Sequence, residues 1–324
     1  MSKLYIIGNG FDLAHGLETE YKHFRRYLLV NEESFLYDLE RLYGYSPFNP
    51  DIYHFLLNQQ EEMLNQHNEM IENWLWTAFE DNLSKPDEGE IQSICEAAGD
   101  SLKDIEFGVI EDTLNTHYED QFGFIERLQE YLLAWAKQID LGPAIIKRKV
   151  LRNNTKDWFF TFNYTPVLER IYGIKDSRIC HIHGGILSVD QYNRPIIGHG
   201  NRESIEQHKK WQKESSDQFD EIGSSMNRAF ANLYQRTYKD VDRAIARHVE
   251  FFKKLKHLDE IFVIGHSVNK IDMPYYKKVF KDNPIATWNV YYHLEGEKTK
   301  MESALKGIGI ANLNMISGKE FWDH

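Results

Sequence analysis

The stretch that decides the fold is Lys3-Leu-Tyr-Ile-Ile-Gly8-Asn-Gly10-Phe-Asp-Leu-Ala-His-Gly16. Its first five residues place apolar side chains next to one another, which is the pattern of a short strand buried on both faces. A loop with two closely spaced glycines follows at once. The backbone amides of such a loop can bind a pyrophosphate, so we expect nucleotide contacts at residues 8–11.

The glycine loop departs from the two best-known nucleotide signatures. Its third glycine is Gly16 rather than residue 13, and no Gly-Lys-Ser/Thr follows as in a P-loop. Gly8 and Gly10 also fit a tight strand-to-helix turn that binds nothing. Asp12 can cap the next helical turn, bond a ribose hydroxyl or hold a water. The loop alone therefore leaves both interpretations open.

Strand-like and helix-like runs alternate along the rest of the chain. We predict a helical insertion at about residues 18–150, which includes Phe55 and Met63 and a turn at 44–50, and a second helical segment at about 203–257. Shorter helices are predicted at 166–172 and 274–280. Further strands are predicted at residues 158–162, 178–183, 260–264, 288–292 and 312–316, and an apolar run at 195–197 leads into Gly198-His-Gly200. This alternation predicts one Rossmann-like α/β domain of 324 residues, whose mostly parallel sheet is covered by helices on both faces.

Composition narrows the class of protein. Lys and Arg number 38 against 50 Asp and Glu, a net charge of −12 that disfavours nonspecific binding to nucleic acid. The two cysteines, Cys95 and Cys180, cannot build a four-cysteine zinc site or a disulfide framework. No apolar run approaches about 20 residues, and no signal peptide precedes the first strand. We therefore expect a cytoplasmic protein with no membrane partner.

Polar residues cluster where four of the predicted strands end. Because ligands bind beyond the carboxyl ends of parallel strands, four such clusters predict one shared site. The clusters are Gly8-Asn9-Gly10 with Asp12, Asn163-Tyr164-Thr165, His181-Ile-His183-Gly184, and Gly265-His266-Ser267 with Asp272.

The sequence allows more than one role for several residues of these clusters. Asn163 also fits a simple turn residue. His181 and His183, two apart in a strand, are expected on the same side, where together with His199 and Asp272 they would suit a metallohydrolase. Alternatively one histidine is structural and the other, followed by Gly184, is catalytic. Ser267 lacks the neighbours of a nucleophile elbow, so we expect it to contact phosphate or ribose.

Taken in order, the motifs resemble the AbiH-type family of bacterial phage abortive-infection proteins. The matching pieces are residues 6–16, Trp76-Thr-Ala-Phe-Glu80, Thr161-Phe-Asn-Tyr-Thr165 with Leu168-Glu169, His181-Ile-His-Gly184, Ile197-Gly-His-Gly200, and Gly265-His-Ser267 with Asp272-Met-Pro-Tyr-Tyr276. That family is remotely similar to the sirtuin-like, deoxyhypusine-synthase-like NAD-binding fold. The resemblance implies that Asn163 and His183 match the pair used by sirtuin-like NAD hydrolases in phage defence. The missing four-cysteine module disfavours a sirtuin-type deacylase.

The resemblance implies hydrolysis of NAD at the nicotinamide–ribose bond. The expected catalytic residues are His183, Asn163 and Asp12, with no metal and no required cofactor beyond NAD as substrate or ligand. A homo-oligomer and a phage-derived trigger are the further partners that it implies. The alternatives are a nucleotide-binding sensor without turnover and a hydrolase of another nucleotide. The expected nucleotide contacts are Gly8, Asn9, Gly10, Phe11, His181, Gly265, His266, Ser267 and Asp272.

Overall fold

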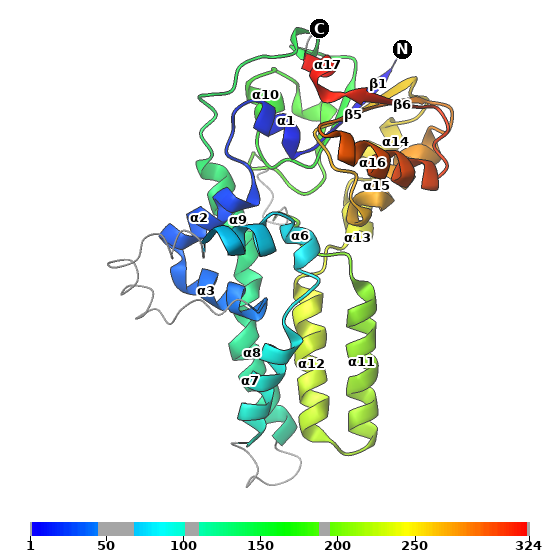
Figure 1. The fold of residues 1–324 in the computed structure, drawn as a ribbon. Coiled ribbons are helices and arrows are strands. Elements are labelled where there is room, and N and C mark those ends of the chain that lie inside the picture. The colour runs from blue at the N-terminus through cyan, green and yellow to red at the C-terminus, as the bar shows by residue number, and fades with distance from the viewer. Residues whose placement is uncertain (1, 45–67, 101–109, 188–194, 323–324) are drawn as a thin grey trace. The chain divides into compact units, whose positions relative to one another are not determined.

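The computed structural model describes residues 2–44, 68–100, 110–187 and 195–322, and it divides into two compact units (Figure 1). The first unit comprises residues 1–20, 132–196 and 240–324, and the second comprises 21–131 and 197–239. Phe55, Met63 and most of the turn predicted at 44–50 lie outside the described residues. Each unit is described separately below.

The first unit is built on one parallel sheet of six strands in the order β3-β2-β1-β4-β5-β6. The strands are β1 (Lys3–Ile7), β2 (Trp158–Thr161), β3 (Ile179–His181), β4 (Glu260–Ile264), β5 (Thr287–Tyr292) and β6 (Leu313–Ser317). The predicted parallel sheet is confirmed, whereas residues 195–197 form no strand. The order reverses between β1 and β4, as in dinucleotide-binding Rossmann sheets.

The register places four strand ends in one row. Ile7 of β1 pairs with Thr161 of β2 and with Ile264 of β4, and Thr161 pairs with His181 of β3. Each is the last residue of its strand and precedes a loop with polar side chains. The four polar clusters predicted from the sequence therefore start at the same edge of the sheet.

The central strand β1 is buried on both faces, because its side chains alternate between two apolar cores. Leu4 and Ile6 belong to one core, and Tyr5 and Ile7 belong to the other. The first core is covered by α13 (Val241–Arg247), α14 (Val249–Lys254), α15 (Met273–Asp282) and α16 (Glu295–Gly307). The second is covered by α1 (Asn9–Ala14), α10 (Val167–Arg170) and α17 (Gly318–Trp322). Helices on both faces confirm the Rossmann-like α/β class.

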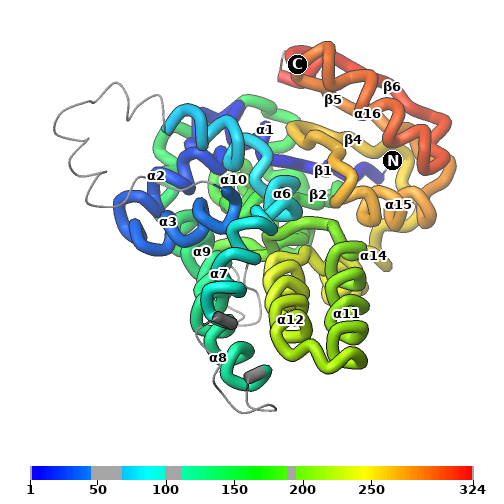
Figure 2. Tube along the Cα trace, turned by 60° about the horizontal axis from the view of Figure 1, so that its bottom comes forward, coloured from blue at the N-terminus to red at the C-terminus, as the bar shows by residue number. Residues whose placement is uncertain are grey.

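The second unit is helical. Its described helices are α2 (Tyr21–Asn31), α3 (Glu33–Leu42), η1 (Glu72–Trp76), α6 (Phe79–Asn82), α7 (Glu88–Asp100), α8 (Ile110–Phe122), η2 (Gly123–Arg127), α11 (Arg202–Asp217) and α12 (Glu221–Arg236), and α9 spans Leu128–Gln138. Figures 1 and 2 show α11 and α12 side by side as a hairpin. Asn201 and Asp220 cap the two helices through side-chain oxygens. None of the helices in the described ranges has the length and apolarity needed to cross a membrane.

Candidate functional site

The loops after β1 and β4 interlock at the point where the strand order reverses. Gly8 N–H donates to the Ile264 carbonyl at 3.0 Å, and Gly10 N–H donates to the Gly265 carbonyl at 2.8 Å. A Cβ on Gly8 would lie 2.6 Å from the Gly265 carbonyl oxygen, which leaves no room for a side chain. Gly265 has φ 64°, and a Cβ there would overlap the Phe11 backbone nitrogen. The glycines therefore hold two loops together, and the amides of Gly8 and Gly10 already have acceptors.

Two neighbours in the glycine loop differ in exposure. Asn9 is exposed, and its side-chain amide donates to the Thr19 carbonyl at 3.0 Å. Phe11 is buried against His15, Tyr172 and Trp322 in the second core. Of the two, Asn9 is the one whose surface a ligand can reach.

Five residues after β1, β2 and β3 form what we call the first cluster: Asp12, Asn163, Thr165, Glu169 and His181. Thr165 donates a short hydrogen bond to Asp12, and Asn163 Nδ2 donates to the Gly8 carbonyl at 3.1 Å. Burial of the fully enclosed Asp12 carboxyl raises its pKa to about 7, against the opposing effect of hydrogen bonds from Thr165 and Asn163. Two of the three predicted catalytic residues, Asp12 and Asn163, thus support the loops.

His181 is held at both ring nitrogens. Nδ1 lies 2.7 Å from the Asn163 carbonyl oxygen, and Nε2 lies 2.8 Å from Glu169 Oε1. Burial lowers the pKa of His181, but the adjacent Glu169 carboxylate outweighs it, so the pKa is raised overall. These contacts give His181 a structural role in joining β3 to α10.

The expectation that His181 and His183 share one side is wrong. β3 ends at His181, and the chain turns at residues 182 and 183, so the strand alternation does not continue to His183. His181 contacts Glu169 of α10, whereas His183 contacts Tyr275 of α15, a helix of the opposite core.

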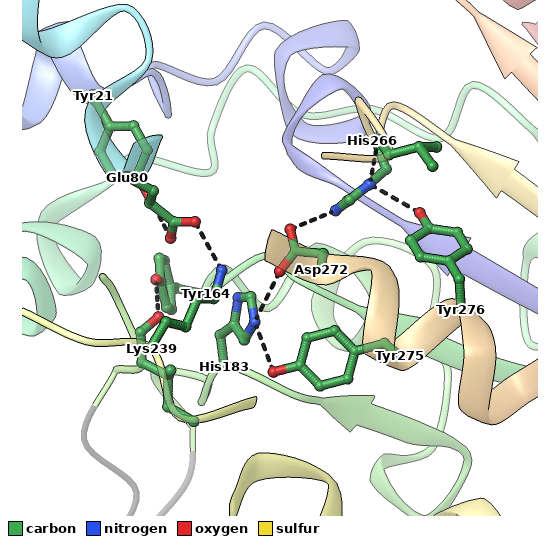
Figure 3. Close-up of polar contacts among 11 residues, drawn as sticks. Tyr21, Glu80, Tyr164, His183, Lys239, His266, Asp272, Tyr275 and Tyr276 are labelled. Atoms are coloured by element: carbon green, nitrogen blue, oxygen red, sulfur yellow. Dashed lines mark hydrogen bonds and ion pairs between the residues drawn. The ribbon is translucent and has the colours of Figure 1, made fainter. Parts of the chain in front are cut away.

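The second cluster consists of His183, Asp272, His266, Tyr275 and Tyr276. His183 Nε2 lies 3.2 Å from the Tyr275 hydroxyl and 3.8 Å from Asp272 Oδ1. The other carboxylate oxygen, Asp272 Oδ2, lies 3.3 Å from His266 Nε2. Figure 3 shows Asp272 between the two imidazoles. The side chains of His183 and Asp272 are only 4% and 8% exposed, so their mutual electrostatic effect is weakly screened by water.

The aromatic ring of Phe162 fixes both histidines of the second cluster from one side. Its centroid lies 4.0 Å from that of His266 and 5.1 Å from that of His183, which it meets edge to face. Phe162 directly follows β2, so the sheet itself positions this contact. Side chains from three strand ends thus assemble the second cluster.

A pocket of about 490 Å³ opens beyond the carboxyl ends of β4 and β5, a size typical of small-molecule sites. Gly10, Gly265, His266 and Ser267 line it, as expected of nucleotide contacts. The sequence reasoning missed the rest of the lining, which comes from α1, the ends of β4 and β5, the residue after β5, α16 and α17. These missed residues are Leu13, Ala14, Ile264, Tyr291, Tyr292, His293, Glu297, Met301, Gly318, Lys319 and Trp322.

The metallohydrolase alternative finds no support in the described ranges, where no group of three or more His, Cys, Asp or Glu side chains is arranged to hold a metal ion. His199 belongs to the second unit and is fully buried. Its Nδ1 accepts from Asn201 N–H at 3.0 Å, so the other nitrogen donates to the Tyr234 carbonyl at 3.0 Å. Burial lowers the pKa of His199 to about 4, which keeps the ring neutral and structural at pH 7.

Of the predicted site residues, the structure brings His183, His266 and Asp272 into one cluster and Asp12, Asn163 and His181 into another. Sequence reasoning missed Tyr275 and Tyr276. A signal for them existed, because Asp272-Met-Pro-Tyr-Tyr276 places a proline in the first turn of a helix directly after a strand-end loop. The next helical residues then point back toward that strand end.

Comparison with known proteins identifies a family. No curated protein and no solved structure matches the chain. One family model, described as "Bacteriophage abortive infection AbiH", matches residues 4–292. This match runs from β1 to the end of β5 and includes every residue of both clusters. The chain therefore belongs to the AbiH family of bacteriophage abortive-infection proteins.

Proposed function

We propose that this protein acts in abortive infection by hydrolysing a nucleotide, and that the bond cleaved is the nicotinamide–ribose bond of NAD. The observation that carries the proposal is the buried His183–Asp272 pair, at 3.8 Å, beside the edge where ligands bind in open α/β sheets. The strand order of dinucleotide-binding sheets supports it. So does the likeness of the Asn163 and His183 motifs to those of sirtuin-like NAD hydrolases.

The chemistry requires one water and one proton acceptor. As the N-glycosidic bond breaks, nicotinamide leaves with the bonding electron pair and positive charge builds on the ribose. His183 Nε2 takes a proton from the attacking water or from a ribose hydroxyl, and ADP-ribose gains the hydroxyl. The proton then passes to solvent. The negative charge of Asp272, whose Oδ1 lies 3.8 Å from His183 Nε2, stabilises the imidazolium while it exists.

The pocket at β4 and β5 suits the remainder of the nucleotide. Tyr291 and Trp322 offer aromatic faces for a base, and such stacking is worth about 1–3 kcal/mol per base. Lys319 is exposed at the pocket and carries the positive charge that a phosphate needs. His266 belongs both to this pocket and to the second cluster, which links nucleotide binding to the proposed catalytic pair.

Incubation of the purified protein with NAD, ATP or ADP-ribose, followed by chromatography, tests the proposal. We expect nicotinamide and ADP-ribose from NAD, and loss of both products in His183→Asn. The matched control is His257→Asn, which changes an exposed histidine that lies at φ 61°, a conformation asparagine tolerates. Full NAD turnover in His183→Asn would exclude the assigned base.

A second candidate function is a nucleotide sensor without turnover. Two observations favour it. The side chains of His183 and Asp272 are almost completely buried. The pocket at β4 and β5 is lined by His266 but not by His183. Calorimetric titration with NAD separates the two functions. Saturable binding with no product over a long incubation, unchanged in His183→Asn, would identify the sensor.

A further inference from the structure

The loop between β4 and α15 contains a buried residue in a costly backbone conformation. Val268 has φ 55°, in the left-handed region, and its side chain is 2% exposed in the first core. A β-branched residue rarely adopts this conformation, and such outliers concentrate at functional sites. Glycine or asparagine would relieve the strain but would give up the apolar packing. The conformation therefore points to a role for the backbone at this position.

The Val268 backbone aims its N–H at a histidine. Val268 N–H donates to His266 Nδ1 at 2.9 Å. Because an amide only donates, Nδ1 must carry a lone pair and no hydrogen. The Tyr276 hydroxyl, also 2.9 Å from Nδ1, is then a second donor. Burial raises the pKa of Tyr276 well above its usual value, so the hydroxyl keeps its proton.

These two donors settle the chemical state of His266. With Nδ1 unprotonated, the ring is neutral and its single hydrogen is on Nε2. Nε2, which then carries the hydrogen, lies 3.3 Å from Asp272 Oδ2 (Figure 3). The tilted ring of Phe162 packs against the His266 imidazole, with the two ring centroids 4.0 Å apart. The Gly8 backbone closes the approach to its Cα and Cβ.

The two carboxylate oxygens of Asp272 thus face two histidines that differ in function. Oδ2 lies 3.3 Å from His266 Nε2, and Oδ1 lies 3.8 Å from His183 Nε2. A carboxylate that is free to rotate would offer no defined oxygen to His183. A neutral N–H group close to a carboxylate favours its ionised form without neutralising its charge.

We propose that His266, locked in its Nε2–H form by the strained Val268 amide and by Tyr276, is a positioning residue that keeps Asp272 charged and aimed at His183. The inference rests on the proposed function, because it assigns a task within that site. It differs from the expectation that His266 is mainly a nucleotide contact. A nucleotide contact acts on KM, whereas a positioning residue acts on kcat.

The first arm of the test needs no activity. Long-range ¹H–¹⁵N correlation spectra of histidine-labelled protein report the hydrogen on each ring nitrogen, and His266→Gln identifies the His266 signals. We expect His266 to be neutral at pH 7.5 with its hydrogen on Nε2. A hydrogen on Nδ1, or an imidazolium, overturns the proposal whatever the enzyme does.

The second arm compares two substitutions of different reach. In His266→Gln the amide nitrogen extends to the former Nε2 position and still donates to Asp272, whereas in His266→Asn it does not. We expect kcat for NAD to fall between about 10-fold and 100-fold in His266→Asn, part of the 10²–10⁴ that a positioned acid–base group contributes. His266→Gln should recover most of that loss, with KM close to wild type in both. The control is again His257→Asn.

The third arm asks whether His266 acts through Asp272. If it does, adding His266→Asn to Asp272→Asn lowers kcat no further, because the positioned carboxylate is already gone. Additive losses, or a rise in KM with unchanged kcat, overturn the proposal and leave His266 as a binding contact. A wild-type protein with no NAD turnover refutes the proposed function instead, and the spectra alone then decide the state of His266.

Discussion

Each of the two polar clusters at the carboxyl edge of the sheet holds a histidine near a carboxylate, but His181 of the first and His183 of the second differ in the length of their contacts. In the first cluster, His181 has close partners for both nitrogens, at 2.7 and 2.8 Å. In the second, His183 Nε2 meets Tyr275 at 3.2 Å and Asp272 at 3.8 Å. Contacts of this length commonly tighten only when a substrate binds. The short contacts of His181 therefore indicate support, and the longer contacts of His183 Nε2 indicate chemistry.

The clusters are joined by the interlocked loops after β1 and β4, so disturbing those loops should have the largest effect. We expect Gly265→Ala to destabilise the first unit by at least about 3 kcal/mol, since the new Cβ meets the Phe11 backbone and the residue needs positive φ. Urea unfolding measures the loss. Gly307→Ala is the control, because a Cβ there meets nothing within 4 Å. Equal stability of both variants would contradict the interlocked arrangement.

Replacing the histidine of each cluster separates support from chemistry most directly. His183→Asn should lower kcat for NAD by about 10²–10⁴-fold, the usual contribution of a positioned proton acceptor, beyond any loss of stability. His181→Asn should lower the unfolding midpoint without a comparable fall in kcat, because Glu169 loses its partner while still largely buried. Steady-state kinetics and thermal unfolding of the two variants decide the comparison. If both variants show the same pattern, the division into two clusters is mistaken.

The titration of Asp12 gives the first cluster a distinct pH signature. Its folded pKa of about 7 lies above its usual value of 3.8, so the folded state holds a proton that the unfolded state has lost. The Asp12 contribution to stability is therefore full below about pH 4 and declines as pH rises to about 7, by up to about 1.4 kcal/mol per unit. We expect Asp12→Asn to remove this slope in urea unfolding between pH 5 and 8. The exposed Asp242→Asn should keep it, and an unchanged slope in Asp12→Asn would argue against a protonated carboxyl.

The pocket beside the second cluster predicts the smallest effect. Lys319→Ala should weaken nucleotide binding about fivefold to tenfold, equivalent to about 1 kcal/mol, and leave the unfolding midpoint unchanged. Because the charge is exposed, the loss should shrink as salt is raised. Titrations at two salt concentrations check this. A loss that is independent of salt would mean that Lys319 does not contact phosphate.

Several parts of the fold were predictable from local pattern. The strand at residues 3–7, the buried runs at 260–264 and 288–292 and the helix near 274–280 all coincide closely with observed elements. These elements were predictable because runs of adjacent apolar residues and flanking glycines indicate secondary structure within the same short stretch of chain. The apolar run at residues 195–197 forms no strand, because a short apolar run without a sheet neighbour is only a packed loop.

The sequence predicted part of the residue content of the candidate site, but it did not predict that these residues separate into two clusters. The sequence by itself determined that His183, His266, Asp272 and Asn163 follow strands, and that parallel strands bring such residues to one edge. Only the tertiary structure decided that Asp12 and Asn163 brace the glycine loop, that β3 stops at His181 so that His183 turns to the opposite face, and that Tyr291 and Trp322 line a pocket. These facts depend on strand order and on which loop fills which space. Strand order and loop packing are determined jointly by residues far apart in the chain, so no local sequence pattern predicts them.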